Sequence, residues 1–213
     1  MTTSSLTSDL EVDIIAVGSG MGASCAALAA QALGLETVIL EKSDVYGGGT
    51  TYSYGIVWVG DNHLERALGI EDSKEDVYDY LFHLAAGHEL ESSLRAYIDN
   101  APEALKFFCD DVGIPFYVAP GFPDYFQGMA PGSLGEGRNL QVRPFEAKSL
   151  GKWHDQLRAA PAVTHRATFE EVAGWGGRAK PQNWDRQLIR ERMEQDIRTF
   201  GAGLIGHLMS AVL

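Results

Sequence analysis

The sequence has little cysteine, no cluster of basic residues and no long hydrophobic run. Its two cysteines, Cys25 and Cys109, lie far apart, and two isolated cysteines make neither a disulfide framework nor a metal cluster. The net charge is −12, and without a lysine- or arginine-rich patch we expect no nucleic-acid partner. The apolar stretches fall short of the ~20 residues that a membrane span needs, so no transmembrane segment is expected.

The N-terminal residues argue against a signal peptide, and the spacing of the histidines argues against a metal site. Residues 1–11 are rich in Ser and Thr and acidic, with neither the basic nor the apolar region of a signal peptide. We therefore expect a flexible N-terminus and a cytoplasmic protein. The six histidines show no ligand spacing, so no metal site is expected.

What the sequence does contain is a strand–helix–strand pattern near its start. A β-branched run at residues 12–17 ends in glycines and predicts a buried parallel strand. An alanine-rich stretch follows and predicts a helix that stops at Gly34. Residues 37–40 predict a second buried strand, closed by Glu41. The fold class is therefore α/β, with a Rossmann-like module at its start.

The turn between the first strand and the helix has the spacing of a dinucleotide-binding motif. Gly18 permits a tight turn and Gly20 allows close approach of a pyrophosphate, while Ala23 is small enough for the third glycine position. The helix N-terminus favours phosphate, and a carboxylate at Glu41 can accept ribose hydroxyls in bonds worth ~1.5–3 kcal/mol each. The alternative is a plain strand–helix connection with Glu41 as a surface acid.

A second glycine loop distinguishes a flavin from a nicotinamide cofactor. Gly47, Gly48 and Gly49 are followed by Thr50 and Thr51, a loop for which a simple NAD domain has no use. Glycines let the chain lie flat against a ligand, and threonine hydroxyls can donate to phosphate or flavin.

This region resembles the fumarate reductase/succinate dehydrogenase-like flavoproteins, through Glu-Lys-x4-Gly-Gly-x-Thr and then Ser53-x-Gly55-x-x-Trp58-x-x-x-Asn62. The resemblance implies FAD as cofactor and an FAD domain interrupted by a substrate cap domain. Position by position it implies the cofactor-binding residues Gly18, Ser19, Gly20, Met21, Gly22, Ala23, Glu41, Lys42, Gly47, Gly48, Thr50, Thr51 and Ser53.

A second stretch narrows the resemblance to the 3-ketosteroid Δ1-dehydrogenases. It consists of Phe122-Pro123-Asp124-Tyr125-Phe126, Ala130-Pro131 and Gly137-Arg138. In that family a proton leaves steroid C2 and a hydride leaves C1 for flavin N5. The resemblance implies an apolar steroid-like substrate, an electron acceptor, and a catalytic role for Tyr125 in supporting a second tyrosine that acts as base. The alternative is that Tyr125 is a half-buried aromatic in a loop.

Departures from the steroid enzymes leave other functions open. Tyr54 and Ile56 stand where those enzymes have glycines, which suggests an altered flavin-facing loop. Arg138 and Arg143 could bind a dicarboxylate, as arginines do in fumarate-type members, although no motif places them there. A different flavoprotein oxidoreductase and a non-catalytic FAD-binding remnant therefore remain as alternatives.

The rest of the chain is read mainly as helix. Ser73 is predicted to cap one helix and Pro102 to open another that stops at Gly113. Residues 114–184 show weak periodicity, and helices are predicted at 184–200 and 201–213.

From this pattern we expect three parts. Residues 1–11 form the flexible N-terminus, 12–150 the N-terminal part of the FAD domain, and 151–213 the junction with a truncated cap domain. The resemblance covers only the first part of a family chain, so an N-terminal fragment is expected, with its oligomeric state open.

Overall fold

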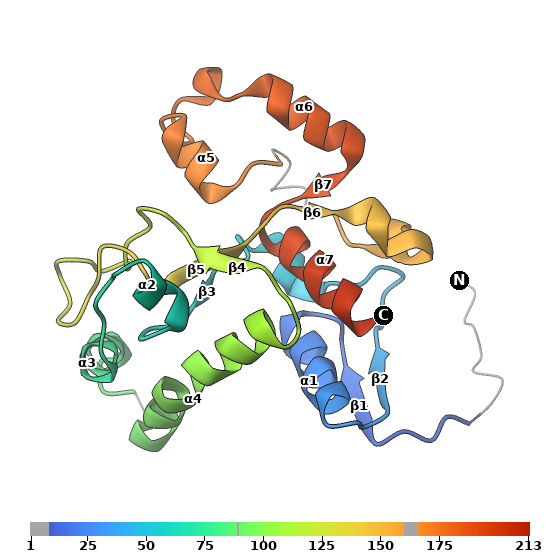
Figure 1. Cartoon of the computed structure of the whole chain (residues 1–213), viewed down its shortest axis with the longest axis horizontal. Coiled ribbons are helices and arrows are strands. Elements are labelled where there is room, and N and C mark those ends of the chain that lie inside the picture. Colours follow the sequence, from blue (N-terminus) through green and yellow to red (C-terminus); the bar gives the residue numbers. More distant parts are fainter. Residues whose placement is uncertain (1–8, 89, 160–165) are drawn as a thin grey trace.

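The computed structural model describes residues 9–88, 90–159 and 166–213 (Figure 1). It mixes helices with short strands. In chain order the elements are β1 (Ile14–Val17), α1 (Met21–Ala32), β2 (Thr37–Leu40), the 3-10 helix η1 (Gly48–Tyr52), β3 (Val57–Trp58), α2 (His63–Ala67), α3 (Lys74–Ala85), α4 (Glu91–Asp110), β4 (Phe116–Val118), β5 (Asn139–Val142), β6 (Phe145–Glu146), η2 (Ala147–Gln156), α5 (Phe169–Gly174), η3 (Pro181–Asn183), α6 (Arg186–Gln195), β7 (Ile197–Arg198) and α7 (Phe200–Val212).

The predicted strand–helix–strand unit is present. Strands β1 and β2 pair in parallel, with Ile14 opposite Thr37 and Val17 opposite Leu40. The connection turns at Gly18, whose φ of +94° lies in the region that favours glycine. Helix α1 then begins at Met21.

The prediction that both strands are buried was wrong. Ile15 is 58% exposed, Val17 83% and Leu40 45%. A parallel strand is buried when helices cover both faces of its sheet and other strands flank it. In the described part of the chain β1 pairs with β2 alone, so neither outer edge of this two-stranded sheet is covered by a further strand.

A second sheet takes two of its three strands, β4 and β5, from residues 114–184, for which the sequence shows weak periodicity. Strands β3, β5 and β4 pair antiparallel in that order. Every residue of β5 is buried, and Leu140 is fully so. These strands have two to four residues each, which is too short for a period to be visible in the sequence.

The helix predictions hold in part. Ser73 accepts a hydrogen bond from the backbone N–H of Asp76 and caps α3 as predicted. Pro102, however, lies inside α4, which begins eleven residues earlier at Glu91, so the prediction that it opens a helix was wrong. The helix predicted over 184–200 is shorter, because α6 ends at Gln195 and β7 follows.

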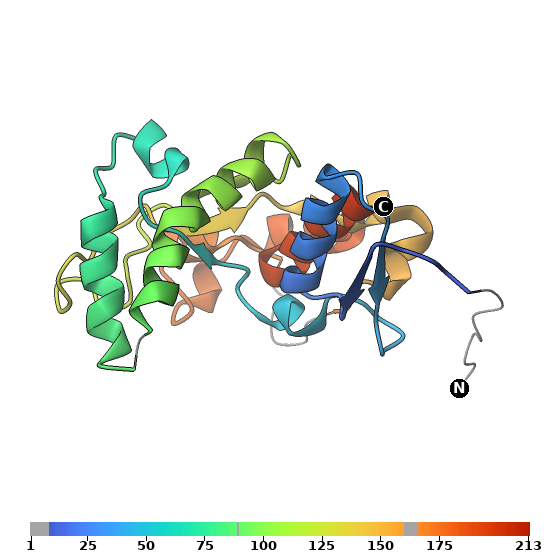
Figure 2. The same ribbon diagram turned by 90° about the horizontal axis from the view of Figure 1, so that it is seen from below.

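Helix α7 forms the centre of the core. Leu204, Ile205 and Leu208 are at most 1% exposed, and in both views the helix lies beside α1 (Figure 2). It also packs on η1, where the backbone N–H of Gly201 donates to the carbonyl of Ser53 at 3.1 Å. None of the described helices combines the length and apolarity that crossing a bilayer requires.

Gly201 should therefore be intolerant of any side chain. A Cβ atom there would lie 1.8 Å from the Thr50 carbonyl oxygen, which is backbone and cannot rotate away. We expect Gly201→Ala to lower the free energy of unfolding by about 1–3 kcal/mol, measured by urea denaturation. Gly135→Ala is the matched control, because nothing lies within 4 Å of its Cβ position. Equal stability of the two variants would contradict the packing described here.

Candidate functional site

The turn from β1 into α1 leaves a helix N-terminus open to a ligand. Gly20 occupies the N-cap position with extended backbone and no side-chain cap, and the first turn carries no acidic residue. The first N–H groups of a helix have no intrahelical partners, and the helix dipole favours an anion at this end. We call the turn of residues 18–23 the cradle. The N–H of Met21 donates to Oγ1 of Thr50 at 3.0 Å, which brings the second glycine loop up to the cradle.

Ser19 connects the three separate parts of the predicted site. Its hydroxyl, which is 2% exposed, donates to Oε2 of Glu41 at 2.5 Å. Oγ of Ser19 also accepts a hydrogen bond from the backbone N–H of Gly47 at 2.9 Å. The turn, the tip of β2 and the triglycine loop are thus held by one side chain, and Glu41 points toward the cradle.

Glu41 is held as a carboxylate. The hydrogen bond from Ser19 and those from backbone N–H groups, among them that of Ser43 at 3.0 Å, keep the pKa of Glu41 below its usual value. An ionised carboxylate is an acceptor on both oxygens and so suits a pair of ribose hydroxyls.

The two glycine loops face each other closely enough that side chains would fill the space between them. A Cβ atom on Gly48 would lie 3.4 Å from Cα of Gly20, and one on Gly20 would lie 3.4 Å from Oγ1 of Thr50. Gly22, by contrast, has nothing within 4 Å of its Cβ position. The cradle therefore fits a diphosphate that lies on bare backbone at the start of α1.

The remaining predicted cofactor residues differ in what they can offer. Thr51 is fully buried and its hydroxyl donates to the Gly48 carbonyl at 3.0 Å, so only its backbone faces the loop. The Ser53 hydroxyl donates to the Thr50 carbonyl at 2.8 Å. Ala23 is half-buried in the first turn of α1, and Lys42 is exposed.

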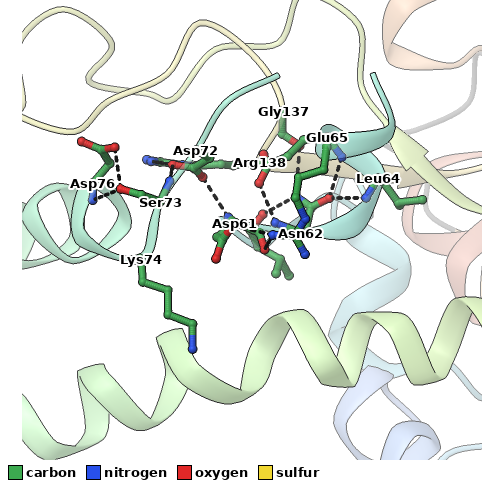
Figure 3. A network of polar contacts seen from close by, with 12 residues as sticks. Asp61, Asn62, Leu64, Glu65, Asp72, Ser73, Lys74, Asp76, Gly137 and Arg138 are labelled. Atoms are coloured by element: carbon green, nitrogen blue, oxygen red, sulfur yellow. Dashed lines mark hydrogen bonds and ion pairs between the residues drawn. The ribbon is translucent and has the colours of Figure 1, made fainter. Parts of the chain in front are cut away.

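Asp124 and Arg138 meet in a buried ion-pair network, of which Figure 3 shows the part around Asp72 and Arg138. The guanidinium of Arg138 donates to both oxygens of Asp72, at 2.7 and 2.5 Å, and to Asp124 at 3.0 Å. It lies over the rings of Trp58 and Tyr80, and the indole N–H of Trp58 donates to Asp124 at 2.7 Å. Because Arg138 is 0% exposed and already paired, it does not bind a dicarboxylate substrate.

Glu65 belongs to the same network but is not paired with the arginine. Its Oε1 accepts from the backbone N–H of Asn62 at 2.6 Å, while Oε2 is buried without a hydrogen-bond partner among the described residues (Figure 3). Burial raises the pKa of Glu65 to about 7. The group is thus close to half-protonated near neutral pH.

Tyr125 stands beside an apolar cleft, not inside the core. Its side chain is 82% exposed and meets the ring of Phe122 edge-on at 6.2 Å. The cleft has a volume of about 430 Å³, and its lining residues are mostly aromatic and aliphatic: Ile56, Trp58, Tyr80, Leu81, Leu84, Tyr97, Tyr125 and Asn139. The Asp124 bonds to Arg138 and Trp58 fix the loop that carries Tyr125.

Arg143, the second arginine considered for a dicarboxylate, lies over an aromatic ring. The Arg143 guanidinium lies 3.8 Å from the centre of the Tyr117 ring. Within residues 9–88, 90–159 and 166–213 no three His, Cys, Asp or Glu side chains come together in a way that could hold a metal ion.

Comparison with known proteins identifies the family of this chain. A family model described as "FAD binding domain" matches residues 13–188. The 3-oxosteroid 1-dehydrogenase of Mycobacterium tuberculosis (strain ATCC 25618 / H37Rv) is 38% identical over 142 residues, 66% of this chain and 25% of that protein. The 4-oxocyclohexanecarboxylate 2-dehydrogenase of Sinomonas cyclohexanicum is 29% identical over 94% of this chain and 34% of its own length.

A solved structure matches as well. It is 3-ketosteroid delta1-dehydrogenase from Sterolibacterium denitrificans in complex with 1,4-androstadiene-3,17-dione. It superposes with a TM-score of 0.80 and 31% identity over 94% of this chain and 38% of that one. The fold resembles that of FAD-binding flavoenzymes. The chain belongs to the FAD-binding domain family, which confirms the predicted resemblance and FAD as the cofactor. It spans about a quarter to a third of the length of the curated relatives compared here.

Ser19→Ala should separate the three parts of the site. The variant removes the bond to Glu41 and the acceptor for Gly47, so we expect the dissociation constant for FAD to rise about fivefold or more. The pKa of Glu41 should move up toward its ordinary value, which NMR titration measures. Ser92→Ala, on an exposed position of α4, is the control. Unchanged FAD affinity in Ser19→Ala would show that the three parts do not act together.

Glu65 should make stability depend on pH. Because its pKa is raised in the folded state, its contribution is fully present below its ordinary value and is lost as pH rises through about 7. We expect the melting temperature of the wild type to fall relative to Glu65→Gln between about pH 5 and pH 8. The exposed Glu103→Gln should run parallel to the wild type. Parallel curves for Glu65→Gln would show that Glu65 is ionised throughout.

Proposed function

We propose that this chain provides the ADP-binding part of an FAD-dependent dehydrogenase that acts on a 3-ketosteroid-like ring ketone. The observation that carries the proposal is the joining of cradle, Glu41 and triglycine loop through Ser19, with the Tyr125 loop fixed beside an apolar cleft. The likeness to steroid dehydrogenases in sequence and structure supports the substrate class.

The proposed roles follow from the contacts. Backbone N–H groups at the start of α1 hold the diphosphate, with Gly18, Gly20 and Gly22 keeping that surface bare. Glu41 accepts the ribose hydroxyls, and the loop from Gly47 to Ser53 follows the cofactor toward its flavin end. FAD, when bound, supplies the acceptor for the hydride that leaves the substrate.

On the substrate side we propose that Tyr125 contributes a hydroxyl to the removal of the substrate proton. A tyrosine has an ordinary pKa near 10, so ionisation at neutral pH needs help from an apolar environment and a second donor. The cleft beside Tyr125 contains Tyr80 and Tyr97 among apolar side chains. We assign residues 12–150 to the FAD domain and 151–213 to its junction with the cap, with α7 returning to pack on α1.

A second candidate substrate is a smaller ring ketone that carries a carboxylate. Tyr54, in place of a glycine of the steroid enzymes, lines a cavity of about 150 Å³ together with Phe169 and Phe200. A cavity of about this size accommodates a single benzene ring. Arg178 lies at this cavity, 4.7 Å from the centre of the Tyr54 ring, and offers a charge for a carboxylate. The Sinomonas relative acts on such a compound by name.

Anaerobic bleaching of the FAD-loaded chain tests the proposal. Loss of flavin absorbance with androst-4-ene-3,17-dione supports a steroid substrate, and loss with 4-oxocyclohexanecarboxylate alone supports the smaller one. Tyr125→Phe should slow bleaching on the order of a hundredfold, because a general acid–base contribution is removed. Tyr78→Phe, which stacks on Phe82 away from the cleft, is the control. Bound FAD that neither ketone bleaches would favour a non-catalytic FAD-binding chain.

A further inference from the structure

Arg158 is fixed beside the loop of residues 43–52, which contains the triglycine segment of the candidate cofactor site. Leu157 forms a parallel bridge with Tyr46, and the backbone N–H of Arg158 donates to the Tyr46 carbonyl at 3.0 Å. The side chain therefore leaves a braced segment of backbone. No sequence motif singles it out, since its partners are more than a hundred positions away.

The guanidinium of Arg158 spans both ends of that loop. Its Nη2 donates to Oγ of Ser43 at 2.7 Å, and its Nη1 lies 3.5 Å from the hydroxyl oxygen of Tyr52. Ser43 in turn donates its backbone N–H to Oε1 of Glu41 at 3.0 Å. Ser43 thus links Arg158 to Glu41, the carboxylate to which we assign binding of the ribose.

Among the described residues the charge of Arg158 has no acidic partner, unlike the other buried or half-buried arginines. Ion pairs with Asp or Glu hold each of those, namely Arg138, Arg166, Arg192 and Arg198. The contacts of the Arg158 side chain within the described residues are two hydroxyls and the Tyr52 ring, and its Nε is buried with no acceptor there. In a chain of net charge −12 this is a free positive charge in a partly dry position. A partly buried charge without a counter-ion is unfavourable, so the arrangement favours an anion.

We propose that Arg158 is a further cofactor-binding residue that pairs with the phosphate charge of the ADP half of FAD. The inference rests on the proposed diphosphate cradle. The planar guanidinium suits phosphate, and its bonds to Ser43 and Tyr52 keep it oriented before the cofactor arrives. It also offsets the repulsion between the Glu41 carboxylate and the diphosphate.

Binding of ADP and of adenosine to the full 213-residue chain tests this pairing. We expect Arg158→Gln to weaken ADP and FAD about tenfold or more in calorimetry or fluorescence titration, the loss of one charge-assisted bond. Adenosine, which lacks phosphate, should change by less than about twofold. Arg158→Lys keeps the charge and should recover part of the ADP affinity. Arg186→Gln, on the exposed start of α6, is the matched control.

Equal weakening of ADP and adenosine would overturn the phosphate contact and leave Arg158 as a brace of the loop, as would a melting temperature lowered without any change in ADP affinity. A wild-type chain that binds neither ADP nor FAD would overturn the inference together with the cradle on which it rests. The dehydrogenation proposal is judged separately, by flavin bleaching.

Discussion

One serine hydroxyl holds the candidate cofactor site together. Ser19 occupies the turn before α1, yet it bonds the tip of β2 through Glu41 and the triglycine loop through Gly47. These three segments come from different parts of the sequence, and Ser19 bonds to both of the others. A buried donor and acceptor at their meeting point sets their spacing, and the spacing decides whether a diphosphate and a ribose can be bound together.

The cofactor half of the site could be predicted because it is local in sequence. Residues 18–53 contain every position that the motif names, and each glycine has a backbone reason visible in the pattern. What the pattern could not give is the direction of side chains. Thr51 turns into the core while Thr50 meets the start of α1, and nothing in two adjacent threonines tells them apart.

Ion pairs between residues far apart in the sequence could not be predicted from it, for a physical reason. Arg138 is brought next to Asp72 and Asp124 by the fold, and the strands of that fold are too short to show a periodic pattern in the sequence. In this motif the resemblance gave a role only to Tyr125, whereas Asp124 fixes the loop through its bonds to Trp58 and Arg138. The burial of β1 was overestimated because a β-branched run indicates a strand but not how many neighbours cover it.

The residues proposed to bind the cofactor and the residue proposed to act on the substrate lie in different parts of the structure. Most of the proposed contacts to the ADP half arise from residues 18–53, against which α7 packs, and Arg158 adds one proposed contact from outside this segment. The substrate side depends on the Tyr125 loop, which stands beside an open cleft with its side chain largely in solvent. Ser19, which joins the proposed ADP-binding segments, is 2% exposed, and Glu41 is held ionised by its neighbours. The proposed ADP-binding residues are thus held together by buried contacts within this chain, whereas the Tyr125 side chain is open to solvent.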